Sequence, residues 1–269
     1  MHSLPSPILI TGAAGHIGTH LRAAWANGPV QMITTDIVTP ETLHPNERFT
    51  PLDLTDRDGL RALMAGAQAV VHLGGLSREG PWDEMMAVNI GGTYNLFEAA
   101  RQCGVARVIY ASSLHATGYY RTDQTLTVET PVRPSNLYGV SKCFGEALAR
   151  NYYDSFGLQC LALRIGSFSE TVKDARMLSS WLSPRDAVRL IEAGLTVEAL
   201  GFQILYGVSD NAARWWQNPP GMLDGWVARD SADSQTGKVQ PGFGPDAPQT
   251  AYQGGGFIDT WSPEDRDRN

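Results

Sequence analysis

The chain has 269 residues, of which 42% are hydrophobic, a formal net charge of -7 and an isoelectric point of about 5.3. This length accommodates one large α/β domain with a small appended lobe, but no second complete domain. The diffuse acidic excess argues against nucleic-acid binding, which requires clustered basic residues, and no stretch approaches the roughly 18 consecutive apolar residues of a membrane span.

The first residues and the cysteines indicate the compartment. The start, MHSLPSPILITGAAG, lacks the basic region and separate apolar segment of a secretion signal, because its apolar run leads directly into glycines. Cys103, Cys143 and Cys160 form no Cys-x-x-Cys pair and no His/Cys cluster at metal spacing. We therefore expect a cytoplasmic protein with reduced thiols and no bound metal. The sequence is compatible with a homo-oligomer.

A glycine loop follows the first predicted strand. The sequence predicts a buried strand over residues 7–11 and a helix over residues 19–27, with Gly12, Gly15 and Gly18 between them. Glycines at this point let the backbone approach a pyrophosphate, while the helix N-terminus offers free N–H groups. The spacing alone is weak evidence, but the flanking strand and helix indicate a dinucleotide site.

The second predicted strand, residues 30–35, ends at Asp36, which lies 18 residues beyond Gly18. An acidic side chain at this point accepts hydrogen bonds from an adenosine ribose. Ile37 and the next two residues include no arginine or lysine, so a 2′-phosphate would meet the carboxylate with no cation to offset it. The prediction is NAD rather than NADP. The alternative role for Asp36 is a strand-end cap.

Further strands and helices alternate along the chain. We expect a strand end with an acidic turn at residues 49–56, a helix over 57–64, a strand over 69–75, a helix over 82–102 and a strand over 107–111. Repeated strand-then-helix units with right-handed crossovers predict a doubly wound parallel sheet, the Rossmann fold. His72 is expected to be a core histidine, and Asn89 to bond the backbone beneath Ser113.

Ser113, Tyr138 and Lys142 form the candidate catalytic group. A helix over residues 137–150 puts Tyr138 and Lys142 on the same face, four residues apart. A free tyrosine is a poor base at neutral pH, and a neighbouring cation lowers its pKa by favouring the phenolate. Ser113 follows a buried strand, at the sheet edge where such folds bind ligands. The alternative is a chance spacing on a helix surface.

The character of the sequence changes after a strand over residues 158–165. A helix beginning at Ser183-Pro184 and a strand over 203–206 are expected, and much of the tail, residues 231–269, should be loop. We predict an NAD-binding core with the catalytic helix over residues 1–167. Residues 168–269 would form a small substrate-binding lobe and C-terminal tail packed on the same domain.

The combined motifs resemble the extended short-chain dehydrogenase/reductases of the NAD-dependent epimerase/dehydratase type over roughly residues 7–170. A closer resemblance, to the bacterial uronate dehydrogenases, covers most of the chain and includes HLGGLS at 72–77, LYGVSKCFGE at 137–146, LRIGS at 163–167 and RMLSSW at 176–181. Such enzymes oxidise C1 of cyclic galacturonate or glucuronate to an aldarolactone with NAD. The resemblance thus implies sugar-acid catabolism.

The motifs and the resemblance together assign roles by position. Tyr138 would remove the C1 hydroxyl proton, Lys142 would hold the nicotinamide ribose and lower the pKa of Tyr138, and Ser113 would bond the reacting oxygen. The cofactor contacts would be Gly12, Gly15, His16, Ile17, Gly18, Asp36, Ile37, Asp53, Leu54, Leu73, Gly74, Gly75, Lys142 and Ile165. The substrate contacts would be Ser77, Ser113, Leu114, His115, Tyr138, Ser167 and Arg176.

Two of the substrate positions are informative. The planar guanidinium of Arg176 can bind both oxygens of a uronate carboxylate, although a surface arginine is the alternative. At position 114 the family pattern has asparagine, whereas this chain has Leu114, whose side chain cannot hydrogen-bond a sugar hydroxyl. The sugar preference therefore stays open between galacturonate and glucuronate.

Two other functions compete with this one. A nucleotide-sugar epimerase or dehydratase shares the catalytic group and the cofactor site, but usually needs a longer C-terminal domain than the roughly 100 residues after Ser167. A regulatory protein that senses NAD without turnover could dispense with Tyr138 and Lys142, and both are present. The sequence favours the dehydrogenase.

Overall fold

A seven-stranded parallel sheet forms the centre of the computed structural model, which describes residues 3–223, 226–239 and 251–258. The order across the sheet is β10-β7-β5-β4-β1-β2-β3. From β1, the chain first adds β2 and β3 on one side and then β4 and the later strands on the other side. Open α/β folds have their ligand crevice at such a switch point. The predicted doubly wound fold is confirmed. The strands are β1 (Ile8–Thr11), β2 (Met32–Asp36), β3 (Glu47–Pro51), β4 (Ala69–His72), β5 (Arg107–Ser113), β7 (Gln159–Ile165) and β10 (Phe202–Gly207).

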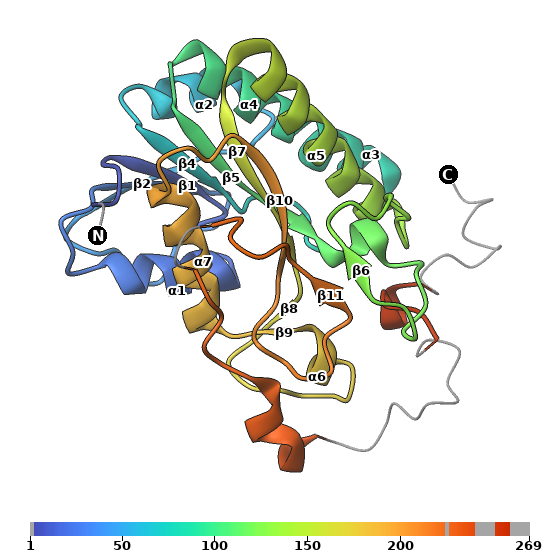
Figure 1. Cartoon of the computed structure of the whole chain (residues 1–269). Helices are drawn as coiled ribbons and strands as arrows, with labels where there is room; N and C mark the ends of the chain where they lie inside the picture. Colours follow the sequence, from blue (N-terminus) through green and yellow to red (C-terminus); the bar gives the residue numbers. More distant parts are fainter. Residues whose placement is uncertain (1–2, 224–225, 240–250, 259–269) are drawn as a thin grey trace.

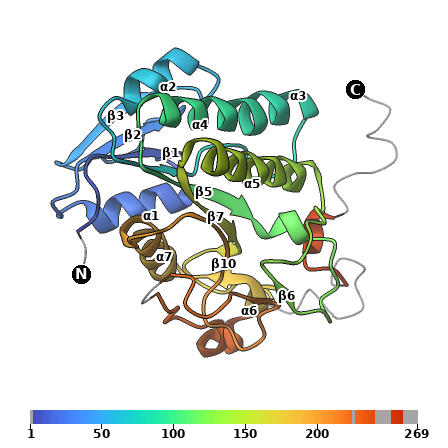
Figure 2. The ribbon, with the colours of Figure 1, turned by 45° about the horizontal axis from the view of Figure 1, so that its top comes forward.

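Helices cover both faces of this sheet (Figures 1 and 2). On one face lie α2 (Arg57–Met64), α4 (Thr93–Gln102) and α5 (Leu137–Phe156), and on the other α1 (His16–Trp25) and α7 (Pro184–Thr196). The side chains of β1 alternate between the two layers: Leu9 packs with the first group, and Ile8 and Ile10 pack with the second. Because both faces are covered, every residue of β1 is buried.

Polar caps set the beginnings of three of these helices. The side chains of Asp56, Asn136 and Ser183 accept hydrogen bonds from the first turns of α2, α5 and α7. The predicted starts at residues 57, 137 and 184 are thus confirmed. α5 runs past the predicted end at residue 150 to Phe156, and the next residue, Gly157, has a φ of 73° that suits a left-handed helix cap.

The helix predicted over residues 82–102 is divided into three parts. It begins as α3 (Trp82–Glu84), continues as the π-helix η1 (Met85–Gly92) and ends as α4. The glycine pair at 91–92 weakens the preference for an α-helix. A Cβ atom on Gly92 would also lie 2.7 Å from Cβ of Leu54, so only glycine lets the helix lie this close to that residue. π-helical turns are frequent beside functional sites.

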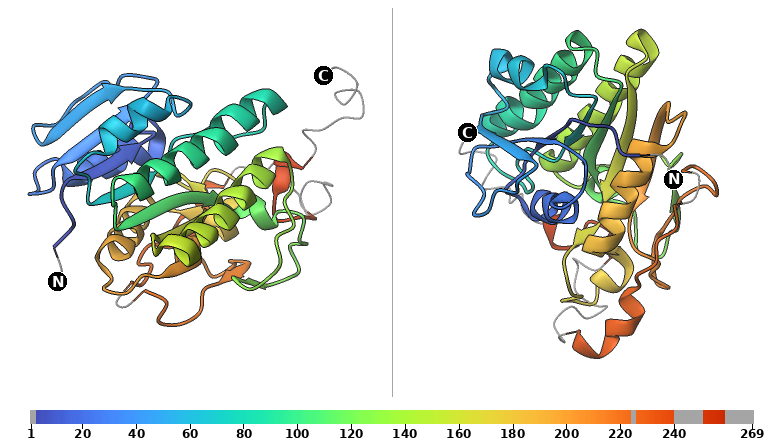
Figure 3. Two further views of the ribbon diagram at one scale, coloured as in Figure 1. Left: turned by 90° about the horizontal axis from the view of Figure 1, so that it is seen from above. Right: turned by 90° about the vertical axis from the view of Figure 1, so that its left-hand side faces the viewer.

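A lobe of short elements lies beyond the carboxyl ends of the strands. In it β6 (Leu126–Thr127) pairs with β11 (Trp216–Gln217), and β8 (Ser167–Phe168) with β9 (Trp181–Leu182). The other elements are the short helices η2 (Leu114–Thr117), α6 (Met177–Ser180), η3 (Ala232–Lys238) and η5 (Gly255–Phe257). Figures 1 and 3 show η3 at the end of the molecule far from α2 and α4.

The chain after residue 167, the predicted boundary of the lobe, contributes to this lobe and also to the core. β10 is a strand of the central sheet, and α7 covers one face of that sheet. Part of the tail predicted to be loop, residues 240–250 and 259–269, lies outside the described residues. Within the described ranges, the structure has no helix whose length and hydropathy would suit a membrane span.

Candidate active site

One cavity of about 910 Å³ gathers every predicted site residue. It lies at the carboxyl ends of β1, β2, β4, β5 and β7 and reaches from the glycine loop to the lobe. Such a volume is at the upper end of those typical of ligand pockets. The predicted cofactor residues that line it are Gly12, Gly15, His16, Ile17, Gly18, Asp36, Ile37, Asp53, Leu54, Leu73, Gly74, Gly75, Lys142 and Ile165. The predicted substrate residues that line it are Ser77, Ser113, Leu114, His115, Tyr138, Ser167 and Arg176.

Close backbone packing shapes the glycine loop. Gly12 has a φ of 70°, and a Cβ atom on it would lie 2.6 Å from the backbone nitrogen of Gly74. A Cβ atom on Gly18 would lie 2.3 Å from the carbonyl oxygen of Gly12. No side chain caps the first turn of α1, so its N–H groups remain available where the helix begins at the cavity. This arrangement suits a pyrophosphate.

Asp36 lies at the end of β2 with both carboxylate oxygens partly used by the backbone. Oδ2 accepts a hydrogen bond from the Ala14 amide at 3.0 Å, and Oδ1 accepts one from the Val38 amide at 3.2 Å. A carboxylate has further lone pairs for two ribose hydroxyls. The only arginine and lysine among the cavity-lining residues are Arg176 and Lys142, which come from other elements than this one. Among the described residues that line the cavity, no cation therefore lies beside Asp36 to offset a 2′-phosphate.

Asn89 holds the loop that follows β4. Its side chain accepts a hydrogen bond from the Leu76 amide at 2.8 Å and donates to the Leu76 carbonyl at 3.0 Å and to Ser141 Oγ at 3.0 Å. The prediction that Asn89 bonds the backbone beneath Ser113 is wrong, because the wider turn of η1 directs the amide to the β4 loop. His72 is a core residue as predicted, 1% exposed and 2.7 Å from Thr11 Oγ1.

Ser113, Tyr138 and Lys142 meet in the cavity where β5 ends beside α5. All three are buried, with exposed fractions of 5%, 8% and 6%. The Lys142 ammonium lies 5.4 Å from the centroid of the Tyr138 ring and 5.4 Å from that of Tyr110. The three residues predicted from the sequence therefore lie close together in the structure, although they come from two separate elements.

Burial decides the ionisation of this group. It raises the pKa of Tyr138 to about 12, against the opposing effect of the Ser113 hydroxyl. It also lowers the pKa of Lys142 to about 8. Desolvation therefore sets the pKa of Tyr138 above its ordinary value in the chain alone, and a lowering of that pKa by Lys142 stays a prediction.

His115 follows Ser113 on η2 and is neutral. Burial, together with the positive charge of Arg176, lowers its pKa to about 3. Its Nδ1 lies 2.8 Å from Ser135 Oγ, and its ring meets that of Tyr138 edge-on at 5.9 Å. The neutral imidazole can therefore form a hydrogen bond with a substrate but adds no charge to the cavity.

Arg176 is a half-buried cation that forms no ion pair within 4 Å among the described residues, although the Asp174 carboxylate is near enough to favour its charge. Its Nε and Nη2 atoms donate to the Gln253 carbonyl at 3.0 and 2.7 Å, and its Nη1 donates to Ser167 Oγ at 3.1 Å. These bonds occupy three of the five N–H donors of a guanidinium. Burial lowers the pKa of Arg176 to about 10, so it stays charged at neutral pH. A site of this kind favours an anion.

Leu114 belongs to an apolar cluster at the substrate end. It is 2% exposed and packs with Leu126 and Trp216 of the lobe and with Tyr206 of β10. The wall of the cavity at this point is therefore apolar.

Several residues that support the site had no assigned role in the sequence. Glu79 accepts hydrogen bonds from the amides of Leu137 and Tyr138 at 3.3 and 2.9 Å, and so fixes the start of α5. Glu146 and Arg164 form a buried ion pair at 2.8 Å. Glu146 shares the helix face of Lys142, four residues on, and that spacing was a usable signal. Gln253 has no local pattern that would connect it with Arg176.

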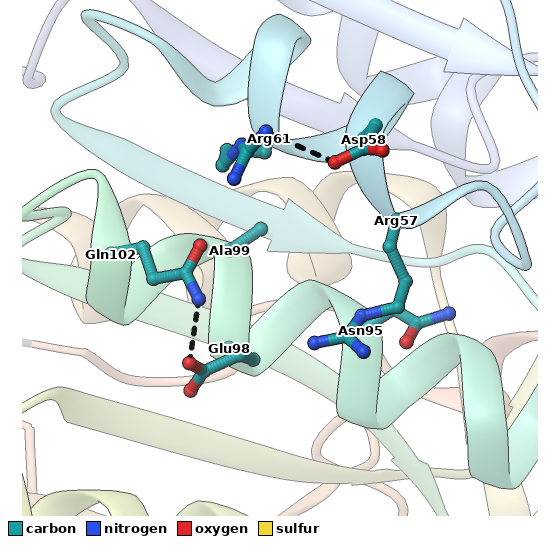
Figure 4. Close-up of a pocket in the computed structure, with 7 residues that line it drawn as sticks. All are labelled: Arg57, Asp58, Arg61, Asn95, Glu98, Ala99 and Gln102. Carbon is teal, nitrogen blue, oxygen red and sulfur yellow. Dashed lines mark hydrogen bonds and ion pairs between the residues drawn. The ribbon is translucent and has the colours of Figure 1, made fainter.

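A second hollow of about 180 Å³ lies between α2 and α4 (Figure 4). Its charged side chains are already engaged, since Arg61 bonds Asp58 at 3.0 Å and Glu98 accepts from Gln102 at 2.7 Å. It is much smaller than the main cavity, and the residues that line it include no buried cation comparable to Arg176. The main cavity is therefore the candidate active site.

Three comparisons show which proteins the chain is similar to. The model of the NAD dependent epimerase/dehydratase family matches residues 8–183. The uronate dehydrogenase of Pseudomonas putida is 39% identical over 254 residues, which are 93% of this chain and 94% of that protein. The crystal structure of glucuronic acid dehydrogenase from Chromohalobacter salexigens has a TM-score of 0.93 at 38% identity, and covers 97% of this chain and 100% of that chain. A mutant uronate dehydrogenase from Agrobacterium tumefaciens, complexed with NAD, has a TM-score of 0.90 at 40% identity, and covers 94% and 97%.

Proposed function

The chain belongs to the NAD dependent epimerase/dehydratase family, and from this membership we propose that it oxidises C1 of a free hexuronic acid, galacturonate or glucuronate, to the aldarolactone with NAD. The observation that carries the proposal is the half-buried cation of Arg176, which forms no ion pair within 4 Å among the described residues, in the cavity that also contains Ser113, Tyr138 and Lys142. An anionic substrate would neutralise that cation and lie beside the candidate base. The uronate dehydrogenases among its relatives support the same substrate class.

The cavity suits NAD at its other end. The glycine loop and the start of α1 would hold the pyrophosphate, and Asp36 would hold the adenosine ribose. Ile37, 73% exposed, and the neighbouring Val38 offer apolar surface for the adenine. When bound, NAD supplies the hydride acceptor for the oxidation.

Tyr138 would take the proton of the C1 hydroxyl, and Ser113 would hold the same oxygen through a hydrogen bond. With a pKa of about 12, the phenol needs a neighbouring positive charge before it can act at neutral pH. Lys142 keeps its proton at pH 7 because its pKa is about 8. Its ammonium would therefore favour the phenolate and hold a ribose hydroxyl.

The substrate carboxylate would bind Arg176 and Ser167, while His115 and Ser77 would bond sugar hydroxyls. The apolar wall at Leu114 offers no hydrogen bond, so a hydroxyl that faces it would contribute less to affinity than in relatives with a polar side chain there. Galacturonate and glucuronate both remain candidate substrates.

We also propose a cytoplasmic location. The three cysteines are unpaired, and a reducing compartment keeps them so. The location is tested by measuring how much of the full-length protein is present in each cell fraction. Light scattering of the purified protein tests whether it forms a homo-oligomer.

The test of the function is nicotinamide reduction by the purified protein. Galacturonate, glucuronate and the neutral sugars of the same configuration are each supplied with NAD and with NADP. We expect the acids with NAD to give reduced nicotinamide, and the neutral sugars or NADP to give far less. Absence of net reduction with either acid, together with tight binding of a nucleotide sugar, would instead support an epimerase or dehydratase.

A further inference from the structure

Residues 251–258, the C-terminal segment, are fixed to the loop that follows η2. The amides of Gln253 and Gly254 donate to the carbonyls of Tyr120 and Gly118, each at 2.8 Å, and Thr122 donates to the Ala251 carbonyl at 3.1 Å. The side chain of Gln253 is fully buried, and its Nε2 donates to the carbonyls of Arg121 and Gln124 at 3.0 and 2.8 Å. The segment is therefore anchored by backbone and side-chain bonds.

The same segment holds the candidate anion-binding side chain. The Gln253 carbonyl accepts from both Nε and Nη2 of Arg176, so one edge of the guanidinium is fixed by the backbone. Arg176 and Gln253 are 77 positions apart in the sequence. Two of the five donors remain free for a ligand among the described contacts, after those to Gln253 and Ser167.

Gly255 packs closely against the side chain of Arg176. Its φ is 61°, a conformation that other residues adopt with strain. A Cβ atom on Gly255 would lie 2.6 Å from Cδ and 2.7 Å from Nε of Arg176. Any larger residue must therefore displace the arginine stem.

The segment also packs against the hydrogen-bond partner of His115. A Cβ atom on Gly254 would lie 3.0 Å from both Cβ and Oγ of Ser135, and that Oγ lies 2.8 Å from Nδ1 of His115. Arg176 and His115 are thus both backed by residues 253–255.

We propose that the C-terminal segment is a positioning element for substrate recognition, in which Gln253 and Gly255 hold Arg176 in the geometry that binds the sugar-acid carboxylate. This inference rests on the proposed function, because it assigns the carboxylate to Arg176. It makes Gln253 and Gly255 positioning residues that act through Arg176 and not on the reacting atoms.

The test is steady-state kinetics of Gly255→Ala with a hexuronate and saturating NAD. A misplaced charged hydrogen bond should raise KM for the acid by about tenfold to a hundredfold, whereas kcat and NAD affinity should change by less than about twofold. Gly66→Ala is the matched control, since Gly66 has a φ of 83° and a Cβ atom on it would have no neighbouring atom within 4 Å. Its kinetic constants should equal those of the wild type.

A double-mutant cycle with Arg176→Ala separates positioning from a general structural effect. In that background Gly255→Ala should change kcat/KM by less than about twofold, because its target is gone. Gln253→Ala, which removes the anchor to Arg121 and Gln124, should raise KM for the acid in the same direction and serves if Gly255→Ala fails to fold.

Two results would overturn the inference: a folded Gly255→Ala or Gln253→Ala with wild-type KM, or effects that multiply with those of Arg176→Ala. The wild type is assayed first, so that absence of hexuronate oxidation refutes the proposed function before the variants are interpreted.

Discussion

Replacing Lys142 by methionine should make the protein more stable at neutral pH while it removes most of the activity. Lys142 is buried, and this burial lowers its pKa from 10.5 to about 8. A shift of about 2.5 units corresponds to about 3 kcal/mol by which the buried charge destabilises the folded chain. Loss of its cation–π contacts with Tyr110 and Tyr138 removes about 1 kcal/mol. The net gain in the free energy of unfolding should be about 2 kcal/mol at pH 7.

The stability that Lys142→Met gains over the wild type must become smaller as the pH rises. Because the pKa of Lys142 is lower in the folded chain than in the unfolded chain, only the unfolded chain holds the proton between about pH 8 and pH 10.5. The stability of the wild type therefore increases with pH across this window. The destabilisation by the buried charge should fall from about 3 kcal/mol at pH 7 to about 1 kcal/mol at pH 9.5.

The assay is urea unfolding of the wild type and of Lys142→Met at pH 7 and pH 9.5, with turnover measured in parallel. Turnover should fall by about a hundredfold or more, since the phenolate of Tyr138 loses its neighbouring cation. Lys173→Met is the control, because Lys173 is exposed and the change should stay within about 0.5 kcal/mol. A variant that is less stable than the wild type at pH 7, or equally shifted at both pH values, would refute the reasoning.

Three further substitutions test other parts of the account. Tyr138→Phe should lower kcat by about 10² to 10⁴-fold with nearly unchanged NAD affinity by calorimetry, and near-normal turnover would exclude Tyr138 as the base. Asp36→Asn should raise kcat/KM with NADP relative to NAD by about tenfold, since a like-charge repulsion is removed, and an unchanged ratio would assign the selectivity elsewhere. Glu146→Ala leaves Arg164 buried and unpaired and should cost about 3–5 kcal/mol in urea unfolding, whereas a loss below about 1 kcal/mol would show that the pair is not needed.

Features encoded by neighbouring residues were predictable from the sequence. The strand before Gly12, the helix after the glycine loop, the start of α7 at Ser183-Pro184, and the spacing of Tyr138 and Lys142 all depend on short-range patterns. The bounds of the first helix were less accurate, since α1 begins at His16 and contains Gly18, whereas the prediction began at residue 19. The alternation of strands and helices was enough to predict the parallel sheet, because right-handed crossovers leave few topologies.

Features that depend on tertiary packing were not predictable from the sequence. The pKa of Tyr138 follows from burial, which a pairwise argument about Lys142 does not include. The partner of Asn89 depends on the π-helical turn of η1. The contact between Arg176 and Gln253 joins residues 77 positions apart, and no periodicity indicates it.

The proposed reaction transfers a hydride from C1 of a hexuronic acid to NAD in this cavity. The most direct measurement uses glucuronate or galacturonate with deuterium at C1, turned over with NAD and analysed by nuclear magnetic resonance. The account predicts one deuterium on the reduced nicotinamide ring for each lactone formed. Deuterium that stays in the sugar or is lost to water would contradict it.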